Sequence, residues 1–129
     1  MRITPIVKRS IFVDLSKTGI KASSKGLILQ TKPNDLAEDS VHRGIRLGIT
    51  VTKKLGNAVT RNRIKRRLRA LAADILSKYT APSHDYVLIG RHNTFARDYS
   101  LLEKDLKYAL HTTKTYVEPG KINRSALGE

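Results

Sequence analysis

The sequence contains no cysteine and no long apolar run, and both absences narrow what the protein can be. Without cysteine the chain can form neither a disulfide nor a thiolate metal site, which fits the reducing cytoplasm. The N-terminal segment MRITPIVKRSIFVDL never reaches the about 7 consecutive apolar residues of a signal peptide. No other stretch approaches the about 18 apolar residues of a membrane span. We therefore expect a cytoplasmic protein without a membrane-spanning segment.

Acidic side chains are also scarce. The 129 residues include 25 Lys and Arg but only 11 Asp and Glu, which gives a formal net charge of +14. No acidic residue lies between Asp39 and Asp74, whereas ten Lys and Arg side chains do. Such a local excess of positive charge indicates a polyanionic partner, either nucleic acid or an anionic membrane surface.

Recognisable catalytic apparatus is missing from the sequence. The four histidines are scattered, with no HxxxH or HExxH pair, and no GxxxxGK[ST] phosphate loop occurs. Asp35, Glu38 and Asp39 could together hold a divalent ion, but composition alone explains their polar segment as a solvated loop, and we favour that interpretation. We therefore expect no catalytic side chain, no metal site and no cofactor bound by the protein itself.

Hydrophobic periodicity predicts one α+β domain over residues 1–115, followed by a flexible tail at 116–129. Apolar residues at three- and four-residue spacing predict helices at 5–18, about 58–79 and 100–113. Short β-type segments predict strands at 26–31, 45–52 and 85–90, with room for a further strand within 20–31. The polar segment 32–43 is expected to form a long hairpin loop.

Local signals suggest where the helices begin and end. Thr4 and Pro5 resemble an N-cap followed by a proline in the first turn, and Gly19 is expected to close that helix in a left-handed conformation. Asn57 is a candidate N-cap for the second helix. Ser100 and Glu103 have the spacing of a capping box for the third.

The second predicted helix carries the strongest functional signal. Its segment RNRIKRRLRA, residues 61–70, holds six cationic side chains and no acidic one. At about 100° per residue, Ile64 and Leu68 share an apolar face while Arg66 and Arg69 lie on the opposite side. Like charges three or four residues apart oppose a helix, and a merely solvated face usually mixes the two signs. Because a phosphate backbone would offset the repulsion, we favour nucleic acid as the partner.

Two common nucleic-acid-binding folds do not fit this pattern. A helix-turn-helix protein needs a second helix just before the recognition helix, but residues 45–52 alternate like a strand. An RNA recognition motif presents aromatic residues on its strands, and neither 26–31 nor 45–52 contains Phe or Tyr.

The segment GITVTKKLGNAVTRNRIKRRLR, residues 48–69, resembles the signature of the bacterial ribonuclease P protein family. That pattern is a strand, a Lys-Lys turn, a Gly-Asn-Ala-Val helix entry and an Arg-Asn-Arg motif with further basic residues. A weaker likeness extends from about Thr4 to Thr113. The resemblance implies a small two-layer α-β sandwich of order αβββαβα, in which the basic helix joins two parallel strands by a left-handed crossover. Most such crossovers are right-handed.

The resemblance also implies a function. Ribonuclease P removes the 5′ leader from precursor tRNA, and in bacteria its RNA subunit performs the hydrolysis with Mg²⁺ held through RNA. The protein is expected to assist as a monomer in a 1:1 complex with that RNA, without a membrane partner. The residues expected to contact the RNA subunit are Lys53, Lys54, Asn57, Arg61, Asn62, Arg63, Lys65, Arg66 and Arg69.

The same family holds the single-stranded leader in a cleft between the sheet and the first helix. The residues that the resemblance assigns to this cleft are Phe12, Ser16, Ile28, Gln30, Thr50 and Thr52. Family members tend to present several aromatic side chains there, whereas this chain matches only Phe12 and has Ser16 and Gln30 at the other aligned positions. Phe12 could instead belong to the core.

Two further functional classes stay open at this point. A purely structural RNA-binding protein, such as a small ribosomal protein, would share the composition but not the signature segment. A peripheral membrane protein or nonspecific DNA-binding protein would share the charge. The apolar helix face is narrow and suited to a core, which disfavours insertion into lipid.

Overall fold

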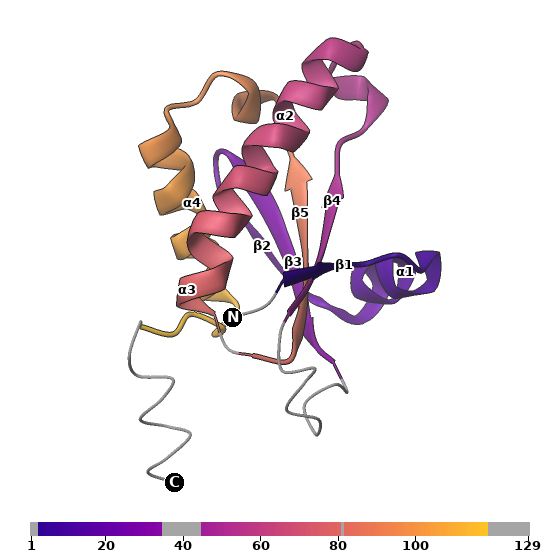
Figure 1. The fold of residues 1–129 in the computed structure, drawn as a ribbon, viewed down its shortest axis with the longest axis vertical. Coiled ribbons are helices and arrows are strands. Elements are labelled where there is room, and N and C mark those ends of the chain that lie inside the picture. The colour runs from indigo at the N-terminus through magenta and orange to yellow at the C-terminus, as the bar shows by residue number, and fades with distance from the viewer. Residues whose placement is uncertain (1–2, 35–44, 81, 119–129) are drawn as a thin grey trace, which may run out of the picture.

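The computed structural model describes residues 3–34, 45–80 and 82–118. Most of the loop predicted at 32–43 and most of the predicted tail therefore lie outside the described residues. The elements follow one another along the chain as shown in Figure 1. They are β1 (Ile3–Pro5), α1 (Arg9–Thr18), β2 (Ile20–Ser23), β3 (Leu27–Pro33), β4 (Ile45–Thr50), η2 (Lys53–Leu55), α2 (Ala58–Leu71), the π-turn η3 (Ala72–Leu76), α3 (Ser77–Tyr79), β5 (His84–Gly90), η4 (His92–Phe95) and α4 (Tyr99–Thr112).

The five strands form one mixed sheet in the order β1-β4-β5-β3-β2. Strand β3 runs antiparallel to β2 and β5, whereas β4 runs parallel to both β1 and β5. The chain passes from β4 to β5 through α2, so the expected crossover between parallel neighbours is present. In Figure 1 both strands run upward, α2 passes in front of the sheet and β5 lies to the left of β4, which is the left-handed sense.

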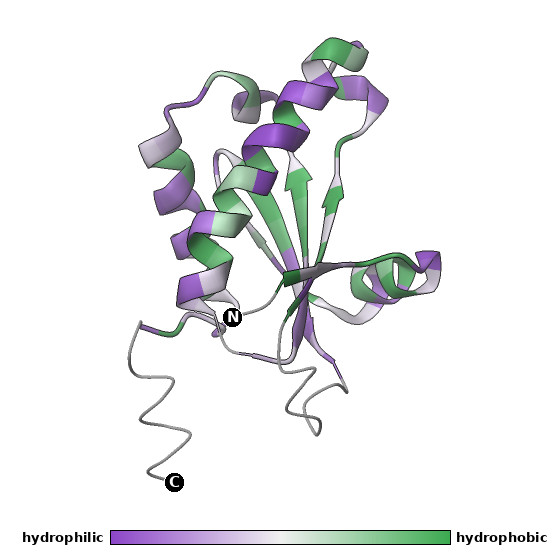
Figure 2. Cartoon of the chain, in the orientation of Figure 1, coloured by the Kyte–Doolittle hydropathy of each residue, from purple (hydrophilic) through white to green (hydrophobic). Residues whose placement is uncertain are grey.

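The two faces of the sheet support two apolar clusters of different size. Successive residues of β5 point to opposite faces: Tyr86 and Leu88 belong to the main core, and Val87 belongs to the smaller cluster. Helices α2 and α4 cover the main core with buried leucines such as Leu68 and Leu106. Figure 2 shows apolar strands behind the polar outer side of α2. Helix α1 packs on part of the opposite face.

The N-terminal prediction is wrong in one respect. Residues 3–5 do not begin a helix but form β1, which pairs in parallel with Ile45–Leu47 of β4. An edge strand tolerates Pro5, because its missing N–H need not pair with a neighbour. Helix α1 therefore begins at Arg9, with Lys8 as an N-cap that makes no side-chain hydrogen bond.

Two expected helix ends also differ from the structure. Gly19 has φ −75°, so it is not left-handed; its small size matters instead, because a Cβ there would lie 2.5 Å from the Leu15 carbonyl oxygen. Helix α4 begins at Tyr99 with Asp98 as N-cap, which places Ser100 inside the helix. The capping box predicted between Ser100 and Glu103 is therefore wrong.

The other predicted helices and strands are confirmed, but the predicted hairpin is wrong: β3 and β4, the strands on either side of that segment, are not neighbours, because β5 lies between them. The alternating strand is present but ends at Thr50, and the basic helix reaches Tyr79 through the π-turn and α3. The predicted boundary before residue 116 stays a prediction, although Tyr116 stacks on His111 with ring centroids 3.9 Å apart. Within the described part of the chain, no helix is long and apolar enough to cross a membrane.

Candidate RNA-binding surface

The entry to α2 is built by a glycine and a capping asparagine. Gly56 has φ +136°, a conformation that other residues rarely adopt, and it turns the chain out of η2. The Asn57 Oδ1 atom then accepts a hydrogen bond of 2.9 Å from the Thr60 N–H. The remaining N–H groups of a first helical turn have no partner within the helix, so this end of α2 carries partial positive charge suited to phosphate.

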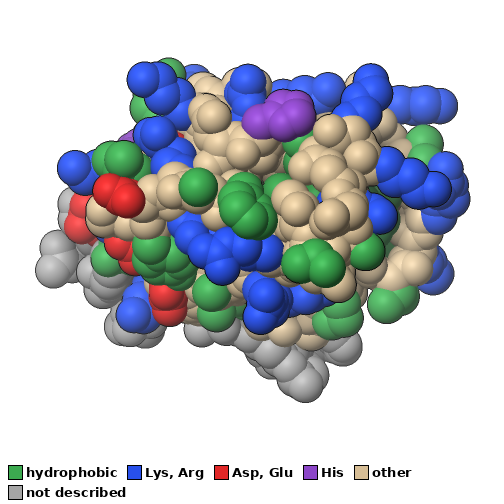
Figure 3. Space-filling view, turned by 90° about the horizontal axis from the view of Figure 1, so that it is seen from above, with side chains coloured by type: hydrophobic (Ala, Val, Ile, Leu, Met, Phe, Trp, Pro, Cys, Tyr) green, Lys and Arg blue, Asp and Glu red, His purple; other side chains and the backbone are tan. Residues whose placement is uncertain are grey.

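The predicted RNA-contact residues share one accessible surface. Ile64, Leu68 and Leu71 are buried against the sheet, which turns the other sides of α2 toward solvent. All nine residues predicted to contact the RNA subunit are exposed or half-buried. Figure 3 looks down on the end of the molecule where α2 begins, and Lys and Arg side chains spread across it while Asp and Glu gather at one side.

Two arginines of α2 also contact the connection between β5 and α4. The Arg63 guanidinium lies 5.2 Å from the centroid of the Phe95 ring, and its Nε atom donates a 3.4 Å hydrogen bond to the Phe95 carbonyl. Arg67 is half-buried and donates to the Arg97 carbonyl. Arg67 therefore supports the fold, as its place beside the apolar face suggests, whereas Arg63 keeps an exposed position.

The residues predicted for the leader cleft fall on the α1 side of the sheet. Strand register places Gln30 and Gly48 on either side of Val87, and Ile28 and Thr50 on either side of Ile89. Because Val87 belongs to the cluster beneath α1, these side chains line the face that α1 covers.

The remaining members of the predicted cleft differ in exposure. The Phe12 ring packs against Gly48 and is half-buried, so it is neither free in solvent nor a full member of the main core. Gln30 is buried. Ser16 is exposed on α1, and Thr52 is exposed two residues after β4 ends. The structure thus brings Phe12, Ile28, Gln30 and Thr50 to one face and leaves Ser16 and Thr52 at its margin.

A hollow of about 390 Å³ connects this face with the basic helix around the edge of the sheet. Phe12 and Gly48 line it on the α1 side, and Arg69 of α2 lines it from the other side. Sequence reasoning treated Arg69 and Phe12 as parts of separate sites. The fold makes them borders of one hollow, because β1 is so short that the edge of β4 beyond Leu47 is left open.

The clearest pKa shifts belong to groups that support the fold. Burial raises the pKa of the Tyr86 hydroxyl to about 12. Burial, together with a hydrogen bond to Asp74, raises the pKa of Tyr99. A hydrogen bond from Lys32 lowers the pKa of Asp14. In residues 3–34, 45–80 and 82–118, no cluster of three or more His, Asp or Glu side chains could hold a metal ion.

Comparison with known proteins identifies the family. The family model described as Ribonuclease P matches residues 2–114. The chain is 43% identical over 112 residues to the ribonuclease P protein component of Paramagnetospirillum magneticum, covering 84% of this chain and 81% of the relative. It is 39% identical over 109 residues to the protein of the same name from Erythrobacter litoralis, with 84% of each covered.

Solved structures agree with the sequence relatives. The Staphylococcus aureus RNase P protein superposes with a TM-score of 0.70 at 27% identity, over 89% of this chain and 99% of that one. The Thermotoga maritima RNase P protein, at 23% identity, shares the fold with a TM-score of 0.67 over 85% and 94% of the two chains. Sequence and fold lead to one conclusion: the chain belongs to the ribonuclease P protein family.

Proposed function

We propose that this chain is the protein component of ribonuclease P, and that it binds the RNA subunit and helps it remove the 5′ leader from precursor tRNA. The observation that carries the proposal is the exposed basic side of α2, where Arg61, Arg63 and Arg66 have no acidic neighbour on the helix. Phosphate groups of RNA would relieve the repulsion between these side chains. Arginine suits that task because its planar guanidinium can donate two hydrogen bonds to one phosphate.

The chemistry is assigned to the RNA subunit. We propose that Mg²⁺ bound through RNA supports hydrolysis, and that no protein side chain acts as a catalytic group or holds a cofactor. The working unit is one protein with one RNA subunit in the cytoplasm. The protein then contributes affinity and position, since every interaction it adds to the precursor is one that the RNA alone would lack.

The leader is assigned to the face beneath α1. Phe12 offers a partly exposed ring for stacking, which is worth roughly 1 to 3 kcal/mol per base. Thr50 lies two residues beyond Gly48 on the same face of β4 and can hydrogen bond to a base or sugar. The hollow between Phe12 and Arg69 offers a path from the RNA-subunit surface to this face. A leader lying there would meet cationic groups at one end and an aromatic ring at the other.

Activity reconstitution tests the proposal. The purified full-length chain is added to a bacterial ribonuclease P RNA at low Mg²⁺, and cleavage of a precursor tRNA is followed by gel electrophoresis. We expect faster cleavage at the mature 5′ end. Tight RNA binding without any stimulation would instead assign the chain to the structural RNA-binding class.

A further inference from the structure

The connection between β5 and α4 forms a second surface beside the basic helix. We define the η4 platform as residues 91–97 together with the β2–β3 turn, residues 24–26. Its exposed side chains include Lys25, Arg91 and His92, and a hollow next to them is lined by Phe95 and Leu101. One acidic residue, Asp98, also lines the hollow. The platform is therefore basic and partly apolar.

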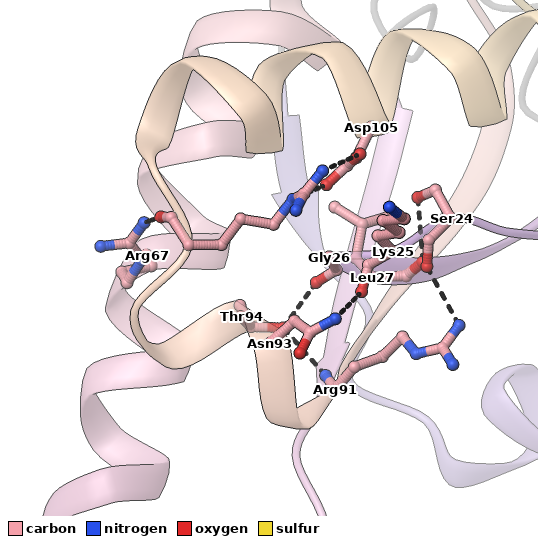
Figure 4. A network of polar contacts seen from close by, with 10 residues as sticks. Ser24, Lys25, Gly26, Leu27, Arg67, Arg91, Asn93, Thr94 and Asp105 are labelled. Atoms are coloured by element: carbon pink, nitrogen blue, oxygen red, sulfur yellow. Dashed lines mark hydrogen bonds and ion pairs between the residues drawn. The ribbon is translucent and has the colours of Figure 1, made fainter.

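Hydrogen bonds between distant segments hold this platform in one arrangement. The Thr94 hydroxyl is buried and donates a 2.5 Å hydrogen bond to the Gly26 carbonyl. Asn93 Nδ2 donates to the Lys25 carbonyl over 3.1 Å, and Arg91 Nη1 donates to the Ser24 carbonyl over 3.0 Å. Figure 4 shows these contacts joining η4 to the β2–β3 turn. The loop is thus tied down over most of its length.

Two further arginines tie the platform to the helices. Arg97 forms a two-point ion pair with Asp105 of α4, with N–O distances of 2.7 and 3.2 Å. The Arg97 carbonyl in turn accepts a hydrogen bond from Arg67 of α2. Because α2, α4 and the sheet all hold the loop, its surface is fixed relative to the basic helix. A rigid surface loses little conformational entropy when it binds.

Phe95 is the exposed aromatic group of this rigid surface. About 38% of the residue is accessible, and the Arg63 guanidinium lies over its ring. An aromatic ring with an arginine on it is a sequence-tolerant stacking surface for nucleobases. Arg63 also belongs to the signature motif, so the ring lies directly beside the proposed RNA-subunit contact.

We propose that an unpaired base of the ribonuclease P RNA subunit stacks on the Phe95–Arg63 pair, while Lys25 and Arg91 contact the neighbouring phosphates. The proposal rests on the proposed function, because it assigns a second contact to the same RNA. Charge and position favour RNA as the occupant, since the basic surface of α2 continues onto the platform through Arg63. The residues of the family signature alone would predict contacts with the RNA subunit only on α2 and on the turn that leads into it.

The test compares the affinity of full-length variants for a bacterial ribonuclease P RNA, measured by filter binding over a series of salt concentrations. Phe95→Leu keeps apolar volume but removes the flat ring, and we expect about 5- to 100-fold weaker binding. The slope of log K against log salt should stay unchanged, because no charge is lost. Phe95→Trp, which restores a stacking surface, should bind as the wild type does.

Leu101→Ala is the matched control, since Leu101 lines the same hollow and is 37% exposed. We expect its affinity to stay within about twofold of wild type, and thermal unfolding shows that each variant is folded. Unchanged affinity of Phe95→Leu would overturn the stacking proposal, as would an equal loss in Leu101→Ala. In both cases a wild-type chain that still stimulates cleavage leaves the proposed function standing. A wild-type chain that does not bind the RNA would overturn both.

Discussion

The Phe12 ring of α1 packs directly onto the backbone at Gly48 of β4. A Cβ atom on Gly48 would come within 2.5 Å of the ring carbons Cε1 and Cζ. Glycine in the middle of a strand weakens it, so a close approach is the physical reason for one here. The contact sets how near α1 lies to the sheet, and with it the width of the space between them.

Gly48→Ala should therefore disturb the proposed leader site. We expect a loss of roughly 1 to 3 kcal/mol in unfolding free energy, because the added methyl group must displace the ring. Urea denaturation measures that loss, and KM for precursors with long leaders should rise as well. Gly90→Ala is the control: its Cβ would crowd Ile64 at 2.8 Å, on the α2 side of the sheet. An equal, leader-dependent rise in KM for Gly90→Ala would contradict this account.

Phe12→Ala removes the ring itself. If the ring stacks on a leader base, KM should rise by about 5- to 100-fold for precursors with long leaders and much less for leaderless substrates. Steady-state cleavage with the two kinds of substrate measures the difference. The variant should also lose some stability, because Phe12 packs against the cluster of Ile6, Leu15 and Val87. Equal effects on both substrates would show that Phe12 is purely a core residue.

The basic side of α2 predicts a salt effect. Replacing Arg61, Arg63 and Arg66 together by Ala should weaken binding to the RNA subunit and reduce the slope of log K against log salt by up to about 3 units. The reason is that RNA binding releases about one counterion fewer for each phosphate contact that is lost. Replacing Lys21, Lys78 and Lys104, which are exposed elsewhere, removes the same charge and should change the slope much less. If the two triple variants behave alike, net charge rather than the helix surface governs binding.

Much of the basic surface of α2 could be predicted from the sequence, because it lies on a long helix, next to a strand, whose apolar residues recur at regular spacing. The alternation of residues 45–51 and the three- and four-residue spacing from Ile64 to Ile75 determine which sides are buried, and the structure confirms both. The three-residue strand β1 could not be predicted in this way. Its Thr4-Pro5 pair imitates a helix start, and only pairing with a strand 42 residues away reveals it.

The contact between Arg63 and Phe95, beside the proposed RNA-subunit surface, could not be predicted from the sequence either. It joins residues 32 positions apart and depends on how the η4 loop is held by the β2–β3 turn. No local pattern in the sequence encodes that arrangement. The marginal positions of Ser16 and Thr52 could not be foreseen for a related reason: alignment gives a position along the chain, whereas exposure depends on where α1 and β4 end.

Two ion pairs that line one hollow beside α1 should differ in their contribution to stability. Asp85 is buried and receives a two-point contact from Arg46, at 2.6 and 2.7 Å, whereas the Asp14–Lys32 pair is exposed. Asp85→Ala should cost about 2 kcal/mol, less than for a fully buried pair because the Arg46 side chain is 24% exposed. Asp14→Ala should change stability little, since solvent screens its partner. Chemical denaturation of both variants checks the order, and a larger loss for Asp14→Ala would contradict it.

Asn57 offers a way to separate helix capping from RNA binding. Asn57→Ala removes the hydrogen bond to the Thr60 N–H and should cost about 1 kcal/mol of stability. Asn57→Asp keeps an oxygen at that position, so the cap and the stability should survive, and the negative charge even suits the helix N-terminus. That same charge would repel a phosphate bound there, so RNA affinity should fall by about tenfold although the protein stays folded. Thermal unfolding and RNA binding measured on both variants distinguish the two roles. An Asn57→Asp chain that binds RNA as tightly as wild type would mean that no phosphate approaches this end of α2.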